Sequence, residues 1–256
     1  MEANPPRGHP VESPHFSTTR WSLVLSCGRS EDAQDKAHQA LTELCRIYWR
    51  PIFAFICRRG YSVPDAQDLT QDFFAMLLNG NLLTLADPNR GRFRSLLCTA
   101  LKNFLADQQV KARRKKRGGG LQFVAWDDWM AEAPSQLSLA TQDLTTWTPE
   151  RIFDFRWAAT VVEQALRRLS EECARRGKLR IFTMLSNSLI LDRSEISYAT
   201  LSKSLGVPEA TIKRLLHDLR ARFRAILRDE ISQTLDDPAE LEDEIHHLCA
   251  ALARNT

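Results

Sequence analysis

The chain has 256 residues, of which 43% are hydrophobic, and a formal net charge of only +3. This length suits one large or two small globular domains. No uninterrupted apolar run approaches the ~20 residues that a membrane helix needs, so we expect no membrane contact. The first residues lack the basic start and apolar stretch of a signal peptide, so we expect a cytoplasmic protein.

Helical spacing of the apolar residues dominates the sequence, and strand signals are nearly absent. We therefore predict an all-α fold with two helical domains joined by a flexible linker. The six cysteines are scattered and include no Cys-x-x-Cys pair, so we expect them to be small buried side chains. The predicted segments are a disordered N-terminal segment (1–19), a first helical domain (20–117), a linker (118–150), a second helical domain (151–231) and a C-terminal helical extension (232–256).

The first domain contains a helix with an acidic outer face. Ser62-Val-Pro-Asp65 supplies a capped start, and apolar residues such as Leu69 and Phe73 face inward. Four polar residues follow at positions i, i+3, i+6 and i+7, and we name them the acidic ridge: Asp65, Asp68, Gln71 and Asp72. A solvated face is the simplest interpretation. Acids on successive turns without basic partners repel one another, however, so we favour a basic partner surface.

The next predicted helix, over 93–117, begins amphipathic and ends basic. Its inner face is predicted from five apolar residues: Phe93, Leu97, Leu101, Phe104 and Leu105. On the outer side we place six polar residues: Arg92, Arg94, Lys102, Asn103, Asp107 and Gln108. Six of the seven residues from Lys111 to Arg117 are basic, among them Arg113 and Arg114. Two or three charges would compensate the helix dipole, so this run favours a phosphate-binding track over a solvated face.

Residues with the chemistry of a metal or catalytic site are few. Asp127 and Asp128 form a lone acid pair in the linker, and His246, His247 and Cys249 have no partners at ligand spacing. No phosphate loop, nucleophile elbow, His-Glu-x-x-His motif or dinucleotide fingerprint occurs. We therefore predict no catalytic residue, no metal and no cofactor.

The second domain begins at the cap Thr148-Pro149-Glu150 and contains a predicted helix-turn-helix over Tyr198–Arg224. Gly206 can take the positive φ that ends the first helix, and Pro208 fits the first turn of the second. The second helix has an apolar stripe, made of Ile212, Leu216, Leu219, Phe223 and Ile226. Its remaining surface is basic and contains Lys213, Arg214, His217, Arg220 and Arg224. An ordinary helical hairpin with a solvated basic face is the alternative. The turn, the apolar stripe and the basic charge together favour a helix-turn-helix that binds in the major groove of DNA.

The C-terminal extension contains one more predicted helix, which starts at Asp237-Pro238. Its apolar residues are Leu241, Ile245, Leu248 and Leu252, at heptad-like spacing, and we expect them to pack on the second domain.

These elements together resemble the extracytoplasmic-function (ECF) sigma factors, small RNA polymerase sigma factors of the sigma-70 family. The resemblance covers about residues 20–231. It rests on Asp-Ala-x-Asp-Leu-x-Gln-Asp-Phe-Phe at 65–74, on Arg92-Phe-Arg-Ser-Leu-Leu, on the linker and on the helix-turn-helix. The Arg20-Trp21-Ser22 start and the Asp-Pro-Ala-Glu sequence at 237–240 are similar to one large bacterial subgroup.

The resemblance implies sigma region 2-like and region 4-like domains and gives the surfaces roles. The acidic ridge matches the surface that binds the coiled coil of the polymerase β′ subunit, although the family often has an acid where Gln67 stands. The surface that melts and captures the −10 element corresponds to Arg92, Arg94, Lys102, Asn103, Gln108, Arg113 and Arg114. The reader of the −35 element corresponds to Glu209, Thr211, Lys213, Arg214, His217 and Arg220. The partners implied are core RNA polymerase (β′ and β subunits), promoter DNA and, as a candidate, an anti-sigma factor.

Two other hypotheses stay open at this stage. A conventional helix-turn-helix regulator would bind a promoter fragment tightly without polymerase, and a helical metal enzyme would contain a divalent metal.

Overall fold

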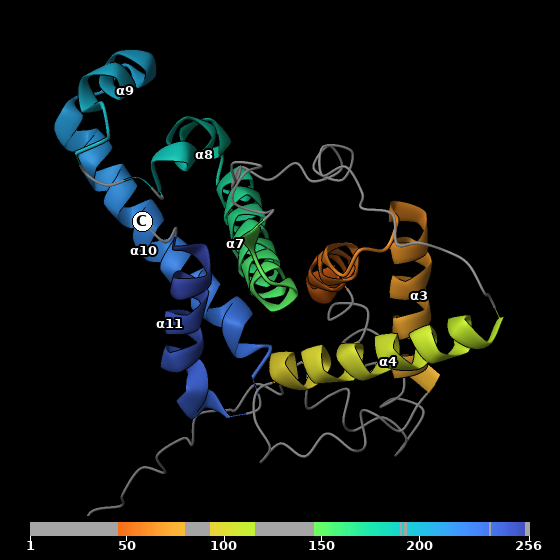
Figure 1. The fold of residues 1–256 in the computed structure, drawn as a ribbon. Coiled ribbons are helices and arrows are strands. Elements are labelled where there is room, and N and C mark those ends of the chain that lie inside the picture. The colour runs from red at the N-terminus through yellow and green to blue at the C-terminus, as the bar shows by residue number, and fades with distance from the viewer. Residues whose placement is uncertain are drawn as a thin grey trace, which may run out of the picture.

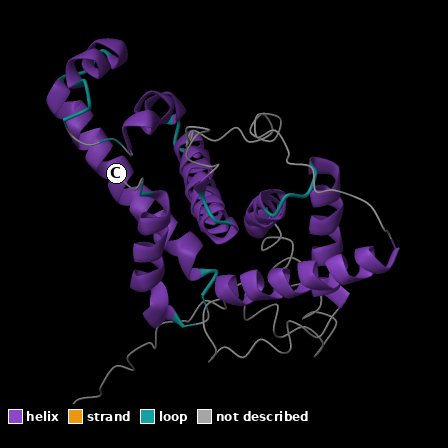
Figure 2. Cartoon of the chain, viewed as in Figure 1, coloured by secondary structure: helices purple, strands orange, loops and turns teal. Residues whose placement is uncertain are grey.

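A computed structural model describes residues 46–79, 93–115, 146–189, 191, 194–235 and 237–253. Of these residues 86% are helical and none is in a strand, which confirms the predicted all-α class (Figure 2). No helix within these ranges has the length and apolar character needed to cross a membrane. Outside them lie the predicted disordered segment 1–19, residues 80–92, Asp127-Asp128 and most of the predicted linker.

The described helices follow one another with short connections after residue 146. They are a helix over 46–58, α3 (Val63–Asn79), α4 (Phe93–Lys115), α7 (Pro149–Arg175), α8 (Leu179–Leu185), α9 (Tyr198–Leu205), α10 (Glu209–Ser232) and α11 (Leu241–Leu252), with 3-10 turns at η2 (Ser186–Leu189) and η3 (Pro238–Glu240).

The helix over 46–58 lies between α3 and α7 (Figure 1). On one side Trp49 stacks on Phe74 of α3, with ring centroids 5.7 Å apart. On the other side Tyr48 stacks on Phe153 of α7, with centroids 6.3 Å apart. Since Tyr48 and Phe153 are each 1% exposed, the two predicted halves of the chain share one hydrophobic core.

Helix α7 belongs to both halves. Thr148 caps it, because the Thr148 hydroxyl accepts a hydrogen bond from the N–H of Arg151. Between Ile152 and Val162 nearly every side chain is buried, whichever way it points, whereas from Ala165 onward burial follows a single face. A helix that is buried all round must be surrounded by other elements. The first three turns of α7 therefore lie inside the shared core, and its later turns form one wall of the second half.

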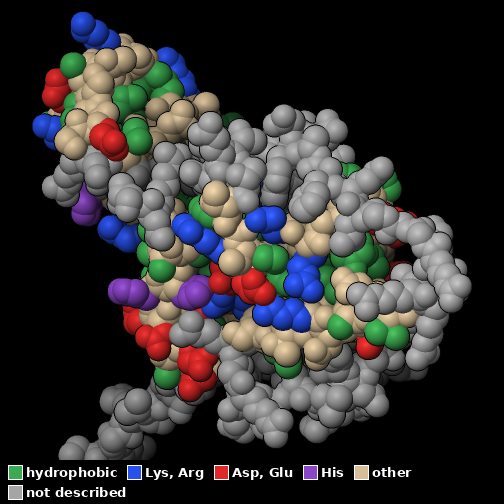
Figure 3. All heavy atoms as spheres, in the orientation of Figure 1, with side chains coloured by type: hydrophobic (Ala, Val, Ile, Leu, Met, Phe, Trp, Pro, Cys, Tyr) green, Lys and Arg blue, Asp and Glu red, His purple; other side chains and the backbone are tan. Residues whose placement is uncertain are grey.

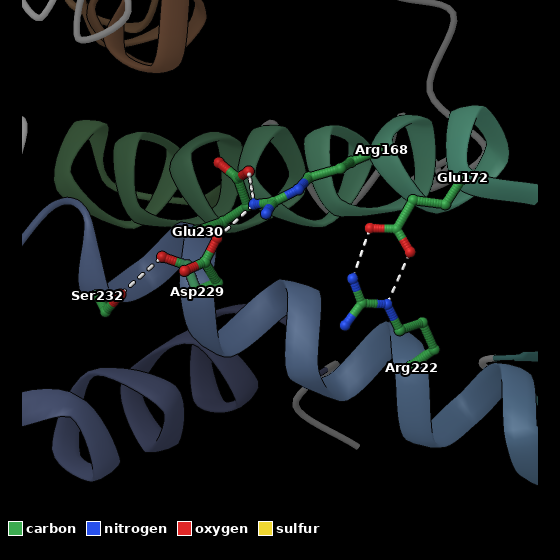
Figure 4. Close-up of polar contacts among 6 residues, drawn as sticks. All are labelled: Arg168, Glu172, Arg222, Asp229, Glu230 and Ser232. Atoms are coloured by element: carbon green, nitrogen blue, oxygen red, sulfur yellow. Dashed lines mark hydrogen bonds and ion pairs between the residues drawn. The ribbon is translucent and has the colours of Figure 1, made fainter. Parts of the chain in front are cut away.

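Helix α10 packs along this later part of α7, and polar pairs tie the two helices together (Figure 4). Arg168 of α7 binds both Asp229 and Glu230 at the end of α10. Helix α11 packs on α7 and α10 through Leu248, which is 2% exposed, and through the half-buried Ile245. The predicted C-terminal helix and its packing on the second half are thus confirmed.

Candidate nucleic-acid and partner interfaces

The predicted helix-turn-helix is present as α9, a short turn and α10. Gly206 ends α9 with φ of +69°, the left-handed conformation that its lack of a Cβ permits, and its N–H donates to the carbonyl of Ser202 at 2.9 Å. The Ser202 hydroxyl donates to the carbonyl of Val207 at 2.6 Å, which further fixes the turn. Pro208 lies one position earlier than predicted, as the N-cap of α10, where its carbonyl accepts from the N–H groups of Thr211 and Ile212.

The two faces of α10 follow the predicted division closely. Four stripe residues are buried and the fifth is half-buried: Ile212, Leu216, Phe223 and Ile226, then Leu219. Among the residues predicted for the −35 surface, Glu209, Lys213, Arg214 and His217 are exposed and Thr211 is half-buried. The Lys213 ammonium lies 5.1 Å from the ring centre of Tyr198, so this cation–π contact joins α10 to α9. The first two turns of α10 therefore present cationic hydrogen-bond donors on an exposed face, and the buried stripe and the contact with α9 hold this face in place.

Arg220, which was also predicted for the −35 surface, binds carbonyl groups within the protein. It is half-buried, and one of its terminal nitrogens donates to two backbone carbonyls, of Ser188 at 2.8 Å and of Leu191 at 2.6 Å. The carbonyl of Ser188 belongs to η2, and that of Leu191 lies in the connection between η2 and α9. Arg220 thus holds that connection on α10. Helical spacing indicated that Arg220 lies beside the stripe, but it did not indicate which carbonyls lie within reach.

The acidic ridge is exposed on α3 at all four predicted positions, Asp65, Asp68, Gln71 and Asp72. The opposite face of α3 enters the core through Phe73 and Leu77. Asp65 also has a local role, because the Ser62 hydroxyl donates to its carboxylate at 2.6 Å and accepts from its N–H at 3.3 Å. The Ser62 hydroxyl therefore caps the helix at the predicted start, which stabilises the first turn of α3. The rest of the ridge offers carboxylates to a cationic partner.

The residues predicted for the −10 surface are divided between two environments. Lys102 and Asn103 are exposed on α4, as expected, whereas Gln108 is half-buried. Arg113 and Arg114 lie within the helical part of α4, and Arg92 lies outside the described residues. The Lys102 ammonium is 2.9 Å from the carboxylate of Glu150 on α7. That hydrogen bond raises the pKa of Lys102, and both side chains stay partly exposed.

The prediction that Arg94 lies on the outer face of α4 is wrong, because its side chain is buried and only 6% of the residue is exposed. The physical reason was present in the sequence. Arg94 precedes Leu97 by three positions and Leu101 by seven, so helical periodicity places all three on the inner stripe. Gln108 follows Leu101 by seven positions and is half-buried for the same reason. A charged residue on an inner stripe requires partners inside the protein.

The partners of Arg94 come from α7 and α11, both more than fifty residues away in the chain. Its guanidinium binds Asp154 of α7 and donates to Glu244 of α11 at 3.2 Å. It also donates to Nε2 of His247 at 2.8 Å and lies 4.9 Å from the ring centre of Trp157. The Nε2 of His247 also lies 3.5 Å from a carboxylate oxygen of Asp154. We call these four side chains (Asp154, Glu244, His247 and Trp157) the Arg94 cage.

The electrostatics of the cage favour the charged arginine. Burial alone would lower the pKa of Arg94, but the carboxylates of Asp154 and Glu244 outweigh it and raise that pKa above its usual value. Glu244 is 2% exposed, so its buried charge requires a cation such as Arg94 inside the protein. Lys and Arg, Asp and Glu, and His side chains gather where α4, α7 and α11 meet (Figure 3).

Sequence reasoning missed the cage residues, apart from noting His247 as a weak metal candidate. One signal was available. Glu150 and Asp154 lie four residues apart on α7, as do Arg94 and Cys98, with Lys102 four further on. These spacings give each helix one charged edge, with opposite signs on the two helices. The third carboxylate, on α11, could not have been found this way, because it is close only in the folded chain.

Among the described residues, no group of three or more His, Cys, Asp and Glu side chains is arranged to hold a metal ion. Comparison of the chain with protein-family models, with curated proteins and with solved structures finds no match in any of the three.

Proposed function

We propose that this protein is a sigma factor of the ECF type, which binds core RNA polymerase and directs promoter-specific transcription initiation. The observation that carries the proposal is the presence of two exposed surfaces of opposite character on one chain. They are the acidic ridge of α3 and the cationic face at the start of α10. An acidic surface suits a basic protein partner, and a cationic helix-turn-helix face suits the major groove.

In this proposal the acidic ridge binds the coiled coil of the polymerase β′ subunit, with the β subunit as a second contact. Asp68 and Asp72 lie four residues apart and are exposed, so they repel each other weakly in the free protein. A basic partner would turn that repulsion into attraction. The other ridge residues, Asp65 and Gln71, flank them on the same side of α3.

The test is co-purification of core polymerase with the wild-type protein and with the variant Asp68→Arg. We expect the variant to lose at least about 90% of the bound polymerase, because a charge reversal at the centre of a complementary interface introduces repulsion. Glu171→Arg is the matched control, since Glu171 is also an exposed acid and lies on α7. Equal retention of polymerase by the wild type and by Asp68→Arg would refute the ridge contact.

The cationic face of α10 reads the −35 element in this proposal, and α4 contributes to the −10 surface with Lys102, Asn103 and the basic run that includes Arg113 and Arg114. Transcription run-off with core polymerase on a library of promoter fragments tests both roles together. Selective transcription of a subset of fragments is the expected result.

The proposed protein works in the cytoplasm, where the polymerase is, and uses neither catalytic residue nor cofactor. An anti-sigma factor is a candidate further partner.

A stand-alone helix-turn-helix regulator is the second candidate function. The observation that favours it is the shared core, because a chain that behaves as one body suits a single site on duplex DNA. This candidate predicts tight and specific binding to a promoter fragment in the absence of polymerase. Fluorescence anisotropy with a labelled duplex, with and without core polymerase, separates the two functions.

A further inference from the structure

The geometry of the shared core conflicts with simultaneous contact to two promoter elements. Elements centred near −10 and −35 are about 25 base pairs apart, which is about 85 Å along a duplex with a rise of ~3.4 Å per base pair. A compact chain of this length has a radius of gyration of about 18 Å and is therefore roughly 45 Å across. The closed arrangement is too small to place α4 on one element and α10 on the other.

The chain between α4 and α7 is long enough to allow separation. Thirty residues lie between Lys115 and Thr146 in the sequence. Fully extended, such a segment spans up to about 100 Å. Separation must therefore occur where the two halves touch, which is at α7 and α11 on one side and at the helix over 46–58 and α4 on the other.

Two kinds of contact hold these surfaces together. The apolar kind is the packing of Tyr48 and Phe55 on Phe153, with ring centroids 6.3 and 6.5 Å apart. The polar kind comprises the ion pairs of Lys102 with Glu150 and of Arg50 with Glu163, and the Arg94 cage, where Glu244 lies 3.2 Å from the guanidinium. Glu244 is carried by α11, which is fixed to the second half by the buried Leu248 and the half-buried Ile245. The C-terminal helix thus reaches across the junction and binds α4 of the first half.

We propose that α11 is an intramolecular latch, which holds the two halves closed through the Arg94 cage and is released when core polymerase binds. This inference rests on the proposed function, since it concerns access of core polymerase and promoter DNA. The open state, which is competent to bind, is higher in free energy than the closed state because the cage and the apolar contact are broken in it. A ligand of the open state then binds with an affinity reduced by the fraction of molecules that are open. Weakening the latch raises that fraction and tightens binding.

The experiment compares full-length wild-type protein with Glu244→Gln, which removes the charge of the latch and keeps the size of the side chain. Glu242→Gln is the matched control, because Glu242 lies on the same helix, is exposed and pairs only with Arg228 of the same half among the contacts described. Hydrogen–deuterium exchange reports opening, and affinity for core polymerase reports its consequence. For Glu244→Gln we expect faster exchange in both 93–102 and 241–252, and about tenfold tighter binding of core polymerase. Glu242→Gln should leave both quantities at the wild-type level.

Three results would overturn the latch. Unchanged exchange in 93–102 would mean that Glu244 does not hold α4. Faster exchange without tighter polymerase binding would make the cage a purely structural contact, while wild-type binding would still support the proposed function. Absence of polymerase binding by every form would refute the proposed function together with its control by α11. Circular dichroism confirms folding, and if Glu244→Gln does not fold, His247→Ala makes the same test at a cage residue of α11 whose side chain is 34% exposed.

Discussion

Arg222 of α10 and Glu172 of α7 form a two-bond ion pair between the helices that build the second half of the molecule (Figure 4). The Nε and one Nη of Arg222 donate to the two carboxylate oxygens at 2.7 and 2.6 Å. This planar arrangement is the strongest form of an arginine–carboxylate contact. The side chain of Glu172 is 10% exposed and that of Arg222 is 45% exposed, so the pair sits at the edge of the core.

The pair predicts a pH dependence of stability. The hydrogen bonds from Arg222 lower the pKa of Glu172, and partial burial opposes them less strongly. A carboxylate whose pKa is lowered in the folded state stabilises the fold fully at pH values above its pKa in the unfolded state, about 4.3. This stabilisation is lost as the pH falls through its pKa in the folded state. We expect Glu172→Gln to be less stable than wild type by about 1 kcal/mol at pH 7, and equally stable at strongly acidic pH.

Thermal unfolding of both proteins between pH 7 and strongly acidic pH measures this difference. Glu171→Gln, at the exposed neighbouring position, is the control and should follow the wild type throughout. A difference between wild type and Glu172→Gln that stayed constant across the whole pH range would contradict the assignment.

Buried and exposed ion pairs on α4 should differ in their contribution to stability. Arg94→Met leaves Glu244 buried without its main cation, and such a loss typically costs about 3–5 kcal/mol of unfolding free energy. Lys102→Met breaks a pair that is nearly half exposed on both sides and should cost less than about 1 kcal/mol. Urea denaturation of both variants measures the contrast.

A double variant sharpens this prediction. Arg94→Met combined with Glu244→Gln removes both charges of the buried pair, so part of the lost stability should return. Strictly additive losses in the double variant would show that the two residues do not interact in solution.

The turn of the helix-turn-helix allows a comparison of two glycines in the same conformation. Gly206 and Gly177 have φ of +69° and +67°, and an added Cβ at either would meet no atom within 4 Å. Alanine at each position should therefore cost about 1–2 kcal/mol through backbone strain alone. Only Gly206→Ala should also weaken DNA binding, because Gly206 sets the angle between α9 and α10. Chemical denaturation and DNA-binding anisotropy measure the two effects, and equal loss of DNA binding in both variants would contradict this role.

Arg214 and Arg220 should respond differently to alanine substitution, although both were predicted to contact DNA. Arg214 is exposed, so Arg214→Ala should lower affinity for promoter DNA by about 1–3 kcal/mol with little change in stability. Arg220 binds the carbonyls of Ser188 and Leu191, so Arg220→Ala should lower stability by about 1–3 kcal/mol. DNA-binding titrations in the presence of core polymerase, together with thermal unfolding, separate the two cases. Loss of stability in Arg214→Ala would argue against its placement on the free face.

The local features of the chain could be predicted from the sequence because each depends on residues close together along it. The side-chain cap at Ser62, the positive φ of Gly206 and the buried stripe of α10 all follow from spacings of seven residues or fewer. Helical periodicity also separates exposed from buried positions on α3, and the acidic ridge is exposed as predicted. The same periodicity, applied strictly, would have placed Arg94 inside.

The sequence by itself determined the all-α class, the helix-turn-helix and the two charged surfaces, because helix formation and amphipathicity are local properties. Only the tertiary structure decided how the halves meet. Phe153 joins the core of the first half, and Glu244 comes from a helix 150 residues beyond Arg94 to neutralise its buried charge. A charged residue on the inner stripe of a helix indicates that it has a partner inside the protein. The identity of that partner depends on which distant helix packs there.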